Sequence, residues 1–391
     1  MLALRAGKEG LALFTMRRLY SLKILWHGRH RFLPAVLAVS FSAVLIAVQF
    51  GVLLGTLAVT SRPIDHAPAQ IWVGIRDVPS IELGHPIPES WMFRVQADPE
   101  IEDVEGYLYE FTYWHKPAGG SVHCCIIGTR LGESALGAVE DLTPEMRTRL
   151  TEPGSVVVDR MELDRLGLTR GVGETAEVMG RKVRVVGLVN GFKSIWGPYV
   201  FCSMQTARML LFQFSPNEMQ YLLARSRPGA DVPSLVERLR RKYPEMAIIA
   251  RHDFSIQTRL YWLTRTRVGI ALGLTSVLAL IVGLVITSQT LYAATAASLR
   301  EYAVLRALGL PRWRISALVL AQSFWIGLAG VATSLPMAMA LARLAGLIGA
   351  EVPLPPWLLA GTIIMTMIIA LLSGLLALRS LRLMEPANLL R

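Results

Sequence analysis

The sequence is poor in cysteine and in charge, and it contains no nucleotide-binding loop. Of its 391 residues, three are cysteines and 18% are charged, whereas 53% are hydrophobic. This composition excludes a disulfide-stapled miniprotein and a disordered chain. A phosphate-binding loop needs Ser or Thr after its Gly-Lys pair, but Gly7-Lys8, the only such pair here, is followed by Glu9. Any ATP-driven work therefore has to be powered by another chain, and we expect this chain not to be an enzyme.

Four stretches lack charged residues altogether and are long enough to cross a membrane. Each has at least 22 residues, and they are 32–59, 268–290, 315–342 and 357–378. About 20 apolar residues in a helix span the hydrocarbon core, where a helix also satisfies its backbone hydrogen-bonding groups without water. No ionisable residue falls within these stretches, which argues against an ion- or proton-coupled carrier. The sequence therefore predicts a membrane protein with four transmembrane α-helices.

The positive charge of the chain is confined to segments next to the predicted spans. The net charge is +11, and the excess lies in residues 1–31, the connector 293–314 and the tail after 378, whereas 61–267 is neutral. By the positive-inside rule, both termini and the connector are cytoplasmic, and the large neutral block is outside. Because the cations flank the membrane rather than cover one folded face, we expect no nucleic-acid partner. Three arginines at the outer end of the second span run against the rule, which long translocated domains obey poorly. They are Arg259, Arg265 and Arg267.

The N-terminal segment is predicted to stay attached to the mature protein. A basic segment of 31 residues precedes an apolar run of 28 residues, and no convincing cleavage site follows. The first span is therefore interpreted as a permanent anchor. Before it, residues 11–26 alternate apolar positions with Arg17, Arg18 and Lys23, which is typical of an amphipathic helix on the anionic inner leaflet.

The 207 residues between the first two spans are enough for one large or two small domains. We expect a large α+β extracytoplasmic domain of two lobes, formed by the elements before and after a bridge near 132–153. The predicted strands are 70–76, 107–116, 121–129, 155–159, 175–179, 182–189, 199–203, 219–226 and 246–250, and the predicted helices are 88–97, 160–166, 205–211 and 232–243. From His252 a helical pattern runs without glycine or proline to Val268, which predicts an uninterrupted stalk helix that continues into the second span.

The three cysteines are predicted to be structural. Adjacent Cys124 and Cys125 cannot easily close a relaxed disulfide, and in a strand their side chains point to opposite faces. With His115 and His123 nearby a metal site is an alternative, although the spacing fits no tetrahedral zinc pattern. Neither a nucleophile–histidine set nor a paired-carboxylate set can be identified from spacing, so we predict neither catalytic residues nor metal ligands.

Two small-residue motifs lie in the first two spans. Gly51 and Gly55 form one G-x-x-x-G motif, and Gly269 and Gly273 form the other. Such motifs allow helices to approach closely, either within one chain or between two copies. We treat these four glycines as candidates for helix packing or a dimer interface. Pro336 is expected to kink the third span.

The connector after the second span carries the most specific motif. Residues 297–315 read ASLREYAVLRALGLPRWRI, in which a helix is predicted to stop at Gly309 and another to begin around Pro311. The motif RExAxLRALG at 300–309 and the tail LRLMEPANLLR at 381–391 resemble the MacB/FtsX-like permeases of ABC transporters, especially the DevC-like form without a fused ATPase. The order of one span, a large outer domain and three further spans also resembles that family. So does the outer hairpin that ends in VRVVGL at 183–188.

The resemblance implies partners and a set of site residues. In the family the connector is a coupling helix that docks on a cytosolic ATPase, and here it would be 299–308. ATP and magnesium would be bound by that ATPase and no cofactor by this chain. A second permease copy, a periplasmic adaptor and an outer-membrane channel are the other implied partners, in a bacterial inner membrane. The implied coupling residues are Arg300, Glu301, Tyr302, Leu305, Arg306 and Gly309.

Three functional hypotheses follow from these observations. The first is the permease subunit of an ABC-type exporter, with adaptor-coupled efflux favoured over lipoprotein release. The second is an FtsX-like mechanotransducer that controls cell-wall hydrolases, and the third is a membrane-anchored enzyme or sensor. The predicted segments are 1–31 (amphipathic helix), 32–59 (span one), 60–251 (outer domain), 252–292 (stalk and span two), 293–314 (coupling helix), 315–345 (span three), 346–356 (outer loop), 357–378 (span four) and 379–391 (tail).

Overall fold

The computed structural model describes residues 29–194, 196–297, 304, 311–347 and 349–383. These residues belong to two compact units, a helical unit of Met1–Gly55 with Ala271–Arg391 and a domain of Thr56–Ile270. Each unit is described by itself below. The predicted amphipathic helix at 11–26, the predicted coupling helix at 299–308 apart from residue 304, and the last eight residues of the tail lie outside the described residues.

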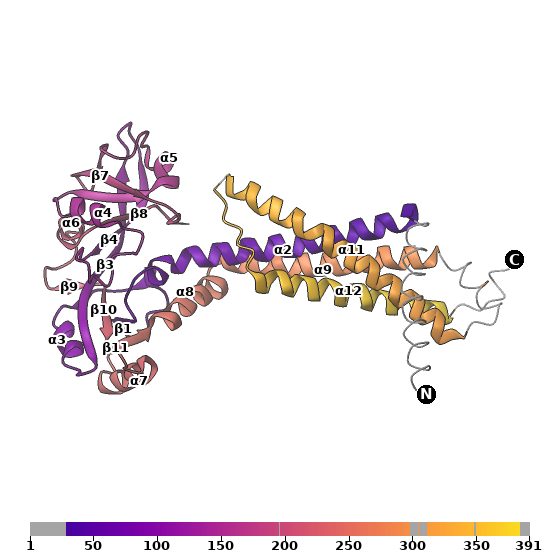
Figure 1. Ribbon diagram of the computed structural model, residues 1–391. Helices are drawn as coiled ribbons and strands as arrows, with labels where there is room; N and C mark the ends of the chain where they lie inside the picture. Colours follow the sequence, from indigo (N-terminus) through magenta and orange to yellow (C-terminus); the bar gives the residue numbers. More distant parts are fainter. Residues whose placement is uncertain (1–28, 195, 298–303, 305–310, 348, 384–391) are drawn as a thin grey trace, which may run out of the picture. The chain divides into compact units, whose positions relative to one another are not determined.

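The helical unit contains the four long apolar helices that the sequence predicts. By length and composition, four helices of the described chain are able to cross a membrane. They run beyond the uncharged stretches because flanking polar residues continue the helical turns. They are α2 (Arg29–Asp65), α9 (Arg267–Ala296), α11 (Arg312–Leu347) and α12 (Pro356–Leu383) (Figure 1).

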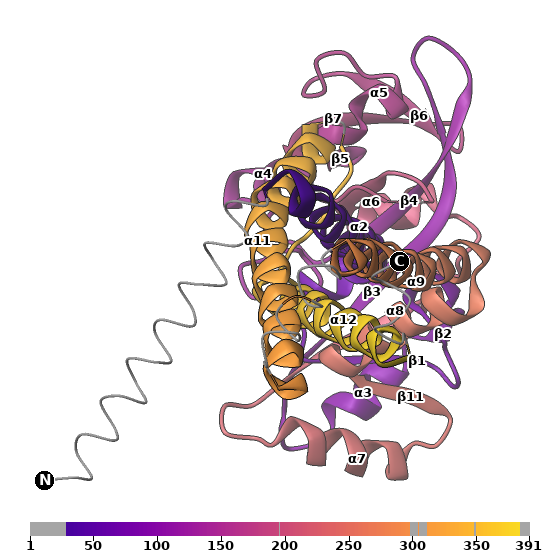
Figure 2. The same ribbon diagram turned by 90° about the vertical axis from the view of Figure 1, so that its right-hand side faces the viewer.

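Within this unit, α2 packs between α11 and α9 through small residues and hydroxyl groups (Figures 1 and 2). Ser40 of α2 donates to the carbonyl oxygen of Gly330 at 3.2 Å, and Thr287 of α9 donates to Ser42 at 3.2 Å. A Cβ atom on Gly330 would lie 2.5 Å from Val39 Cγ1, so the two helices touch where glycine leaves no side chain. Lipid supplies no hydrophobic effect to hold helices together, so close packing of small residues and hydrogen bonds between hydroxyl groups do so instead.

Gly51 and Gly55 of α2 face the loop that joins α11 to α12. A Cβ atom would lie 2.7 Å from Val352 Cγ1 at Gly51, and 2.1 Å from the carbonyl oxygen of Glu351 at Gly55. Both glycines therefore have a packing role within the chain, one of the two readings that the motif leaves open.

The domain is built on one sheet of nine strands. In spatial order they are β11 (Met246–Ala250), β1 (Ile71–Ile75), β10 (Tyr221–Ser226), β3 (Ile101–His115), β4 (Ser121–Thr129), β8 (Tyr199–Ser203), β5 (Ser155–Asp159), β7 (Arg181–Val189) and β6 (Thr175–Val178). The first half of β3 pairs with β10 and the second half with β4. The end of β3 also pairs with β6, where Trp114 lies opposite Val178, so six strands from β3 to β6 close into a barrel. We call these strands the barrel half, and β11, β1, β10 and the start of β3 the open half.

The helices of the domain cover the faces of this sheet. They are η1 (Ile81–Leu83), α3 (Trp91–Gln96), α4 (Pro144–Leu150), η2 (Arg160–Glu162), α5 (Leu163–Leu166), α6 (Met204–Leu210), α7 (Val232–Lys242) and α8 (Arg251–Arg265), and a small second sheet pairs β2 (Ile87–Pro88) with β9 (Glu218–Met219). Leu235 and Leu239 of α7 lie one turn apart and are buried in the same core cluster as Val73 of β1.

The predicted division of the domain into two consecutive lobes is wrong. The strands predicted at 219–226 and 246–250 are present as β10 and β11, but they pair with β1 in the open half rather than with the strands that precede them. The chain thus leaves the open half after β3, builds the barrel half, and returns. The physical reason is strand pairing, because both edges of β1 have unpaired hydrogen-bonding groups until β10 and β11 pair with them.

The cysteines lie where the alternation of a strand places them. Cys124 is buried in the barrel interior, and Cys125 is buried in the core cluster on the other face of β4. Cys202 is also buried in the barrel interior, and all three are free thiols. Burial raises the pKa of the Cys124 thiol to about 12. Such thiols are poor nucleophiles and poor metal ligands, in agreement with a structural role.

Candidate transmission site

The end of α2 and the middle of α8 are joined by an ion pair. The Arg259 guanidinium donates to Asp65 Oδ2 at 2.6 Å and to Ser61 Oγ at 2.7 Å, and Ser61 donates to the same carboxylate at 2.8 Å. Both charged side chains are about one-third exposed, so their contribution to stability is modest, about 1 kcal/mol or less. Through this guanidinium, two helices that are far apart in the sequence are in direct contact.

The inner face of α8 belongs to the core of the domain. Phe254, Thr258 and Trp262 recur every four residues and are all buried. The Phe254 ring lies 5.6 Å from that of Trp72 on β1 and 5.8 Å from that of Tyr221 on β10. A displacement of α8 therefore acts directly on the face of the open half.

The loop between β7 and β8 contacts both α8 and the segment that follows α2. The buried Phe192 ring packs edge-on against His66 at 5.0 Å, and Trp196 packs against Trp262 of α8 at 5.2 Å. Arg165 donates to the carbonyl oxygen of Ser194 at 3.1 Å and to that of Trp196 at 3.3 Å, which fixes the loop on the barrel half. The barrel half is thus connected to both stalk segments.

The stalk is not the uninterrupted helix that the sequence predicts. Helix α8 ends at Arg265, Thr266 is extended with φ −99° and ψ 146°, and α9 begins at Arg267. The Thr266 hydroxyl donates to the carbonyl oxygen of Trp262 at 2.6 Å and accepts from the amide of Gly269 at 3.0 Å. Threonine competes with the backbone for hydrogen bonds in this way, and it caps the new helix.

Gly269 makes this break possible. A Cβ atom there would lie 1.9 Å from the carbonyl oxygen of Trp262, a distance that no side chain tolerates. Gly269, a candidate for helix packing or dimer contact, is therefore required inside the chain, where the start of α9 meets the last turn of α8. Gly273, its partner in the motif, lies partly buried one turn further along α9.

The predicted ATPase-coupling residues all lie outside the described residues. They are Arg300, Glu301, Tyr302, Leu305, Arg306 and Gly309. Their role therefore stays a prediction from the sequence.

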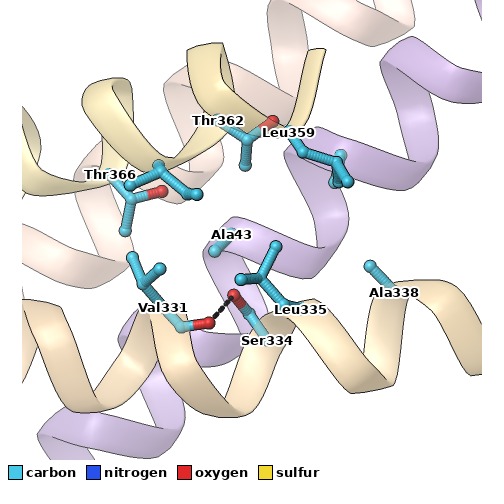
Figure 3. A pocket seen from close by; sticks show the side chains of 10 residues that line it. Ala43, Val331, Ser334, Leu335, Ala338, Leu359, Thr362 and Thr366 are labelled. Carbon is cyan, nitrogen blue, oxygen red and sulfur yellow. Dashed lines mark hydrogen bonds between the residues drawn. The ribbon is translucent and has the colours of Figure 1, made fainter. Parts of the chain in front are cut away.

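The helical unit contains a small cavity between α2, α11 and α12 (Figure 3). Ala43, Leu335 and Thr362 contribute to its lining, and its volume is about 10 Å³. It has room for about one water molecule. Ligand sites are larger, about 300 Å³ or more, so this cavity is no binding site for a transported molecule.

No group of three or more His, Cys, Asp or Glu side chains within the described part of the chain could hold a metal ion. The residues considered for a metal site are separated by the strand: Cys124 points into the barrel, while the His123 ring packs against that of Tyr113 at 4.2 Å. The structure does not bring them together.

One carboxyl group next to α8 has unusual chemistry. Glu82 of η1 lies beside Ser80 and Trp262, and burial raises its pKa from 4.5 to about 7. Its Oε2 atom, Ser80 Oγ and Trp262 Nε1 are buried without a partner of hydrogen-bond geometry. A carboxyl group in such surroundings is neutral at mildly acidic pH and ionised at alkaline pH.

The stability of the protein is therefore expected to fall as pH rises. Below pH 4.5 the Glu82 carboxyl is protonated in both folded and unfolded chains; between 4.5 and about 7 only the folded chain keeps the proton. The folded state loses up to about 3 kcal/mol across this window and does not regain it above pH 7. Thermal unfolding of the full chain in detergent, followed by tryptophan fluorescence from about pH 5 to pH 8, measures this loss.

Glu82→Gln is expected to make the unfolding temperature less dependent on pH. Burial also raises the pKa values of Glu105 and Glu162, so the difference between the variant and the original chain is the relevant quantity. Glu102→Gln, at an exposed position of β3, is the matched control. Identical pH profiles for Glu82→Gln and the original chain would remove the case for this group.

Sequence comparison assigns both parts of the chain. Residues 32–242 match the MacB-like periplasmic core domain, and residues 273–386 match the FtsX-like permease C-terminal family. These matches define a membrane permease with a periplasmic domain. The first of them covers more than half of the chain, and the protein belongs to the MacB/FtsX-like permeases of ABC transporters. No curated protein matches the sequence.

Three solved structures are distantly similar. The periplasmic region of MacB from Actinobacillus actinomycetemcomitans has 12% identity and a TM-score of 0.32, over 48% of this chain and 92% of that one. The extracellular domain of the noncanonic ABC-type transporter YknZ from Gram-positive bacteria has 11% identity and a TM-score of 0.32, over 46% and 98%. A domain of a protein described as a permease from Porphyromonas gingivalis has 13% identity and a TM-score of 0.31, over 54% and 97%. The family membership rests on the sequence matches.

Sequence reasoning missed the residues that join the helices to the domain. Ser61 and Asp65 lie four residues apart on one face of the helix that leaves the membrane, and Arg259 lies in the helix that returns to it. Opposite charges on two such helices are a signal for an ion pair between them. Thr266 is of a residue type preferred at helix N-caps, and this is the signal for the break. Nothing in the sequence marks Glu82, because its pKa depends on burial by residues distant in the chain.

Proposed function

We propose that this chain is the permease subunit of an ABC-type exporter, which transmits motion driven by a separate cytosolic ATPase to its periplasmic domain. The observation that carries the proposal is the pair of family matches, to the outer domain and to residues 273–386, which include the connector between α9 and α11. The ATPase binds ATP and magnesium, and this chain binds no cofactor. The transport function rests on the family and not on a cargo pocket.

The contacts of the domain support transmission through α2, α8 and α9. The Arg259–Asp65 ion pair couples the two stalk helices, and the inner face of α8 is packed into the open half. In this proposal four spans hold the chain in a bacterial inner membrane with both termini in the cytoplasm. The working unit is a homodimer.

Adaptor-coupled efflux, as in a DevC-like system, is the favoured form of this function. The domain exposes large apolar side chains, among them Phe93 of α3 at 70% and Phe212 at 65%. Helix α3, which carries Phe93, and helix α6, which precedes Phe212, lie on the side of the domain away from the end of α8 (Figure 1). Exposed aromatic residues on a secreted domain are typical of protein contacts, and a periplasmic adaptor that leads to an outer-membrane channel would be the partner.

Affinity purification of the tagged full chain from native membranes tests the proposal. We expect an ATPase of the ABC class and an adaptor to be recovered together, and ATP hydrolysis only when that ATPase is present. Recovery of a cell-wall hydrolase in place of the adaptor would favour FtsX-like mechanotransduction, and recovery of a lipoprotein would favour lipoprotein release. ATP hydrolysis by the isolated chain, or purification without any ATPase, would contradict the proposal.

A further inference from the structure

Two arginines flank the break between α8 and α9. Arg265 is the last residue of α8 and Arg267 the first of α9, and both are exposed. Among the described residues neither side chain has an ion pair or a hydrogen bond, in contrast to Arg259, which pairs with Asp65. Both are on the side of the membrane where the positive-inside rule disfavours cations. Their position therefore needs a physical reason.

The conformation of Thr266 decides where these arginines point relative to each other. In a continuous helix, residues two apart lie on nearly opposite faces. Thr266 is extended, so Arg265 and Arg267 are not held on opposite faces of one continuous helix. Exposed guanidinium groups without acidic partners complement the charge of a phosphate group, and their N–H donors fit its oxygen atoms.

The surroundings of the break are typical of a membrane interface. Val268 and Ile270 follow at 45% exposure each and begin the apolar run of α9. Trp196, stacked on Trp262 of α8, is 50% exposed. Indole rings and arginines gather at the headgroup layer, where one end of the side chain is apolar and the other is wet.

We propose that Arg265 and Arg267 bind the phosphate of an anionic phospholipid in the periplasmic leaflet, with Trp196 at the same headgroup layer. The site rests on the periplasmic location of the domain. A bound headgroup holds the break at the membrane surface, so that motion of α9 is passed to α8 instead of being lost by sliding of the joint through the interface. A second copy of the chain and a soluble phosphate are the occupants that the experiment must separate from a lipid.

Photo-cross-linking in vesicles tests this site. The full chain is reconstituted into vesicles of phosphatidylglycerol and phosphatidylcholine that contain a phosphatidylglycerol analogue with a photoactivatable headgroup, and cross-linked peptides are identified by mass spectrometry. We expect cross-links within 194–198 and 259–270. Two cations near an anionic surface raise the apparent affinity for the anionic lipid about 30-fold. Arg265→Gln/Arg267→Gln should lose this gain.

Arg181→Gln/Arg184→Gln is the matched control, because it also removes two exposed arginines, both of them from strand β7. Its cross-linking should equal that of the original chain. Equal cross-linking by Arg265→Gln/Arg267→Gln, equal labelling by a phosphatidylcholine analogue, or competition by millimolar inorganic phosphate would each overturn the lipid site. So would cross-links between two copies at these peptides in place of lipid. Purification with an ATPase is measured separately, so that failure of this site leaves the proposed function intact.

Discussion

Replacing Glu301 and Arg306 together by alanine is expected to abolish the coupling between this chain and its ATPase. Both residues lie in the predicted coupling helix, and the double change leaves the net charge unchanged. Truncating charged residues in a protein interface costs about 2–5 kcal/mol, which corresponds to a loss of about 30-fold or more in affinity. ATPase association in detergent and hydrolysis in vesicles measure the effect.

Arg343→Ala/Glu351→Ala is the control, because it also removes one charge of each sign, from the last turns of α11 and from the loop that follows it. It should leave association and hydrolysis as they are. Normal membrane insertion of the Glu301/Arg306 variant shows that folding is intact. Full coupling after that double change would remove the case for 299–308 as the docking helix.

Replacing Gly269 by alanine is expected to disrupt the joint between α8 and α9. The new Cβ atom would overlap the carbonyl oxygen of Trp262, so the break has to open. Overpacking at such a contact costs about 1–3 kcal/mol. We expect a lower unfolding temperature of the full chain and a loss of ATP-driven transport, while association with the ATPase is retained.

Gly273→Ala separates this intrachain role from a dimer motif. If Gly269 acts through the break, only Gly269→Ala lowers the unfolding temperature and the transport rate. If the two glycines act as a G-x-x-x-G dimer interface, both variants weaken association of two copies in cross-linking experiments. The second result would show that the break is not the reason for glycine at position 269.

Most of the individual elements could be predicted from the sequence, because each depends on local patterns. The absence of charge over at least 22 residues was sufficient for the four apolar helices, and alternation with turn residues located β5, β8 and β11 at their observed bounds. The hairpin of β6 and β7 follows from Gly180, which has a φ of 74°. Local signals of this kind do not depend on the rest of the fold.

The arrangement of the strands could not be predicted in the same way. Closure of the barrel depends on the pairing of Trp114 with Val178, and the open half depends on the return of β10 and β11 to β1. Both are contacts between residues far apart in the chain, and the alternation pattern of a strand says nothing about its neighbours. The predicted order of two successive lobes was wrong for this reason.

The candidate site was predictable only in part. The family resemblance named the coupling residues from a motif, and their role stays a prediction. The sequence does not reveal the break at Thr266, because the absence of glycine and proline from 252 to 268 favours a continuous helix. The Thr266 hydroxyl bonds to the last turn of α8 and to the first turn of α9, and a search for glycine and proline does not detect such a cap.

Strand β3 has a mechanical consequence for the whole domain. It is 15 residues long, and its hydrogen bonds to β10 and to β4 follow one another along a single backbone. A rotation of one half of the domain against the other therefore has to bend β3 between Tyr107 and Leu108, where the pairing with β10 ends and the pairing with β4 begins. A pull on α8 should therefore move the open half and the barrel half together. A partner protein bound to either half would be displaced by the same motion.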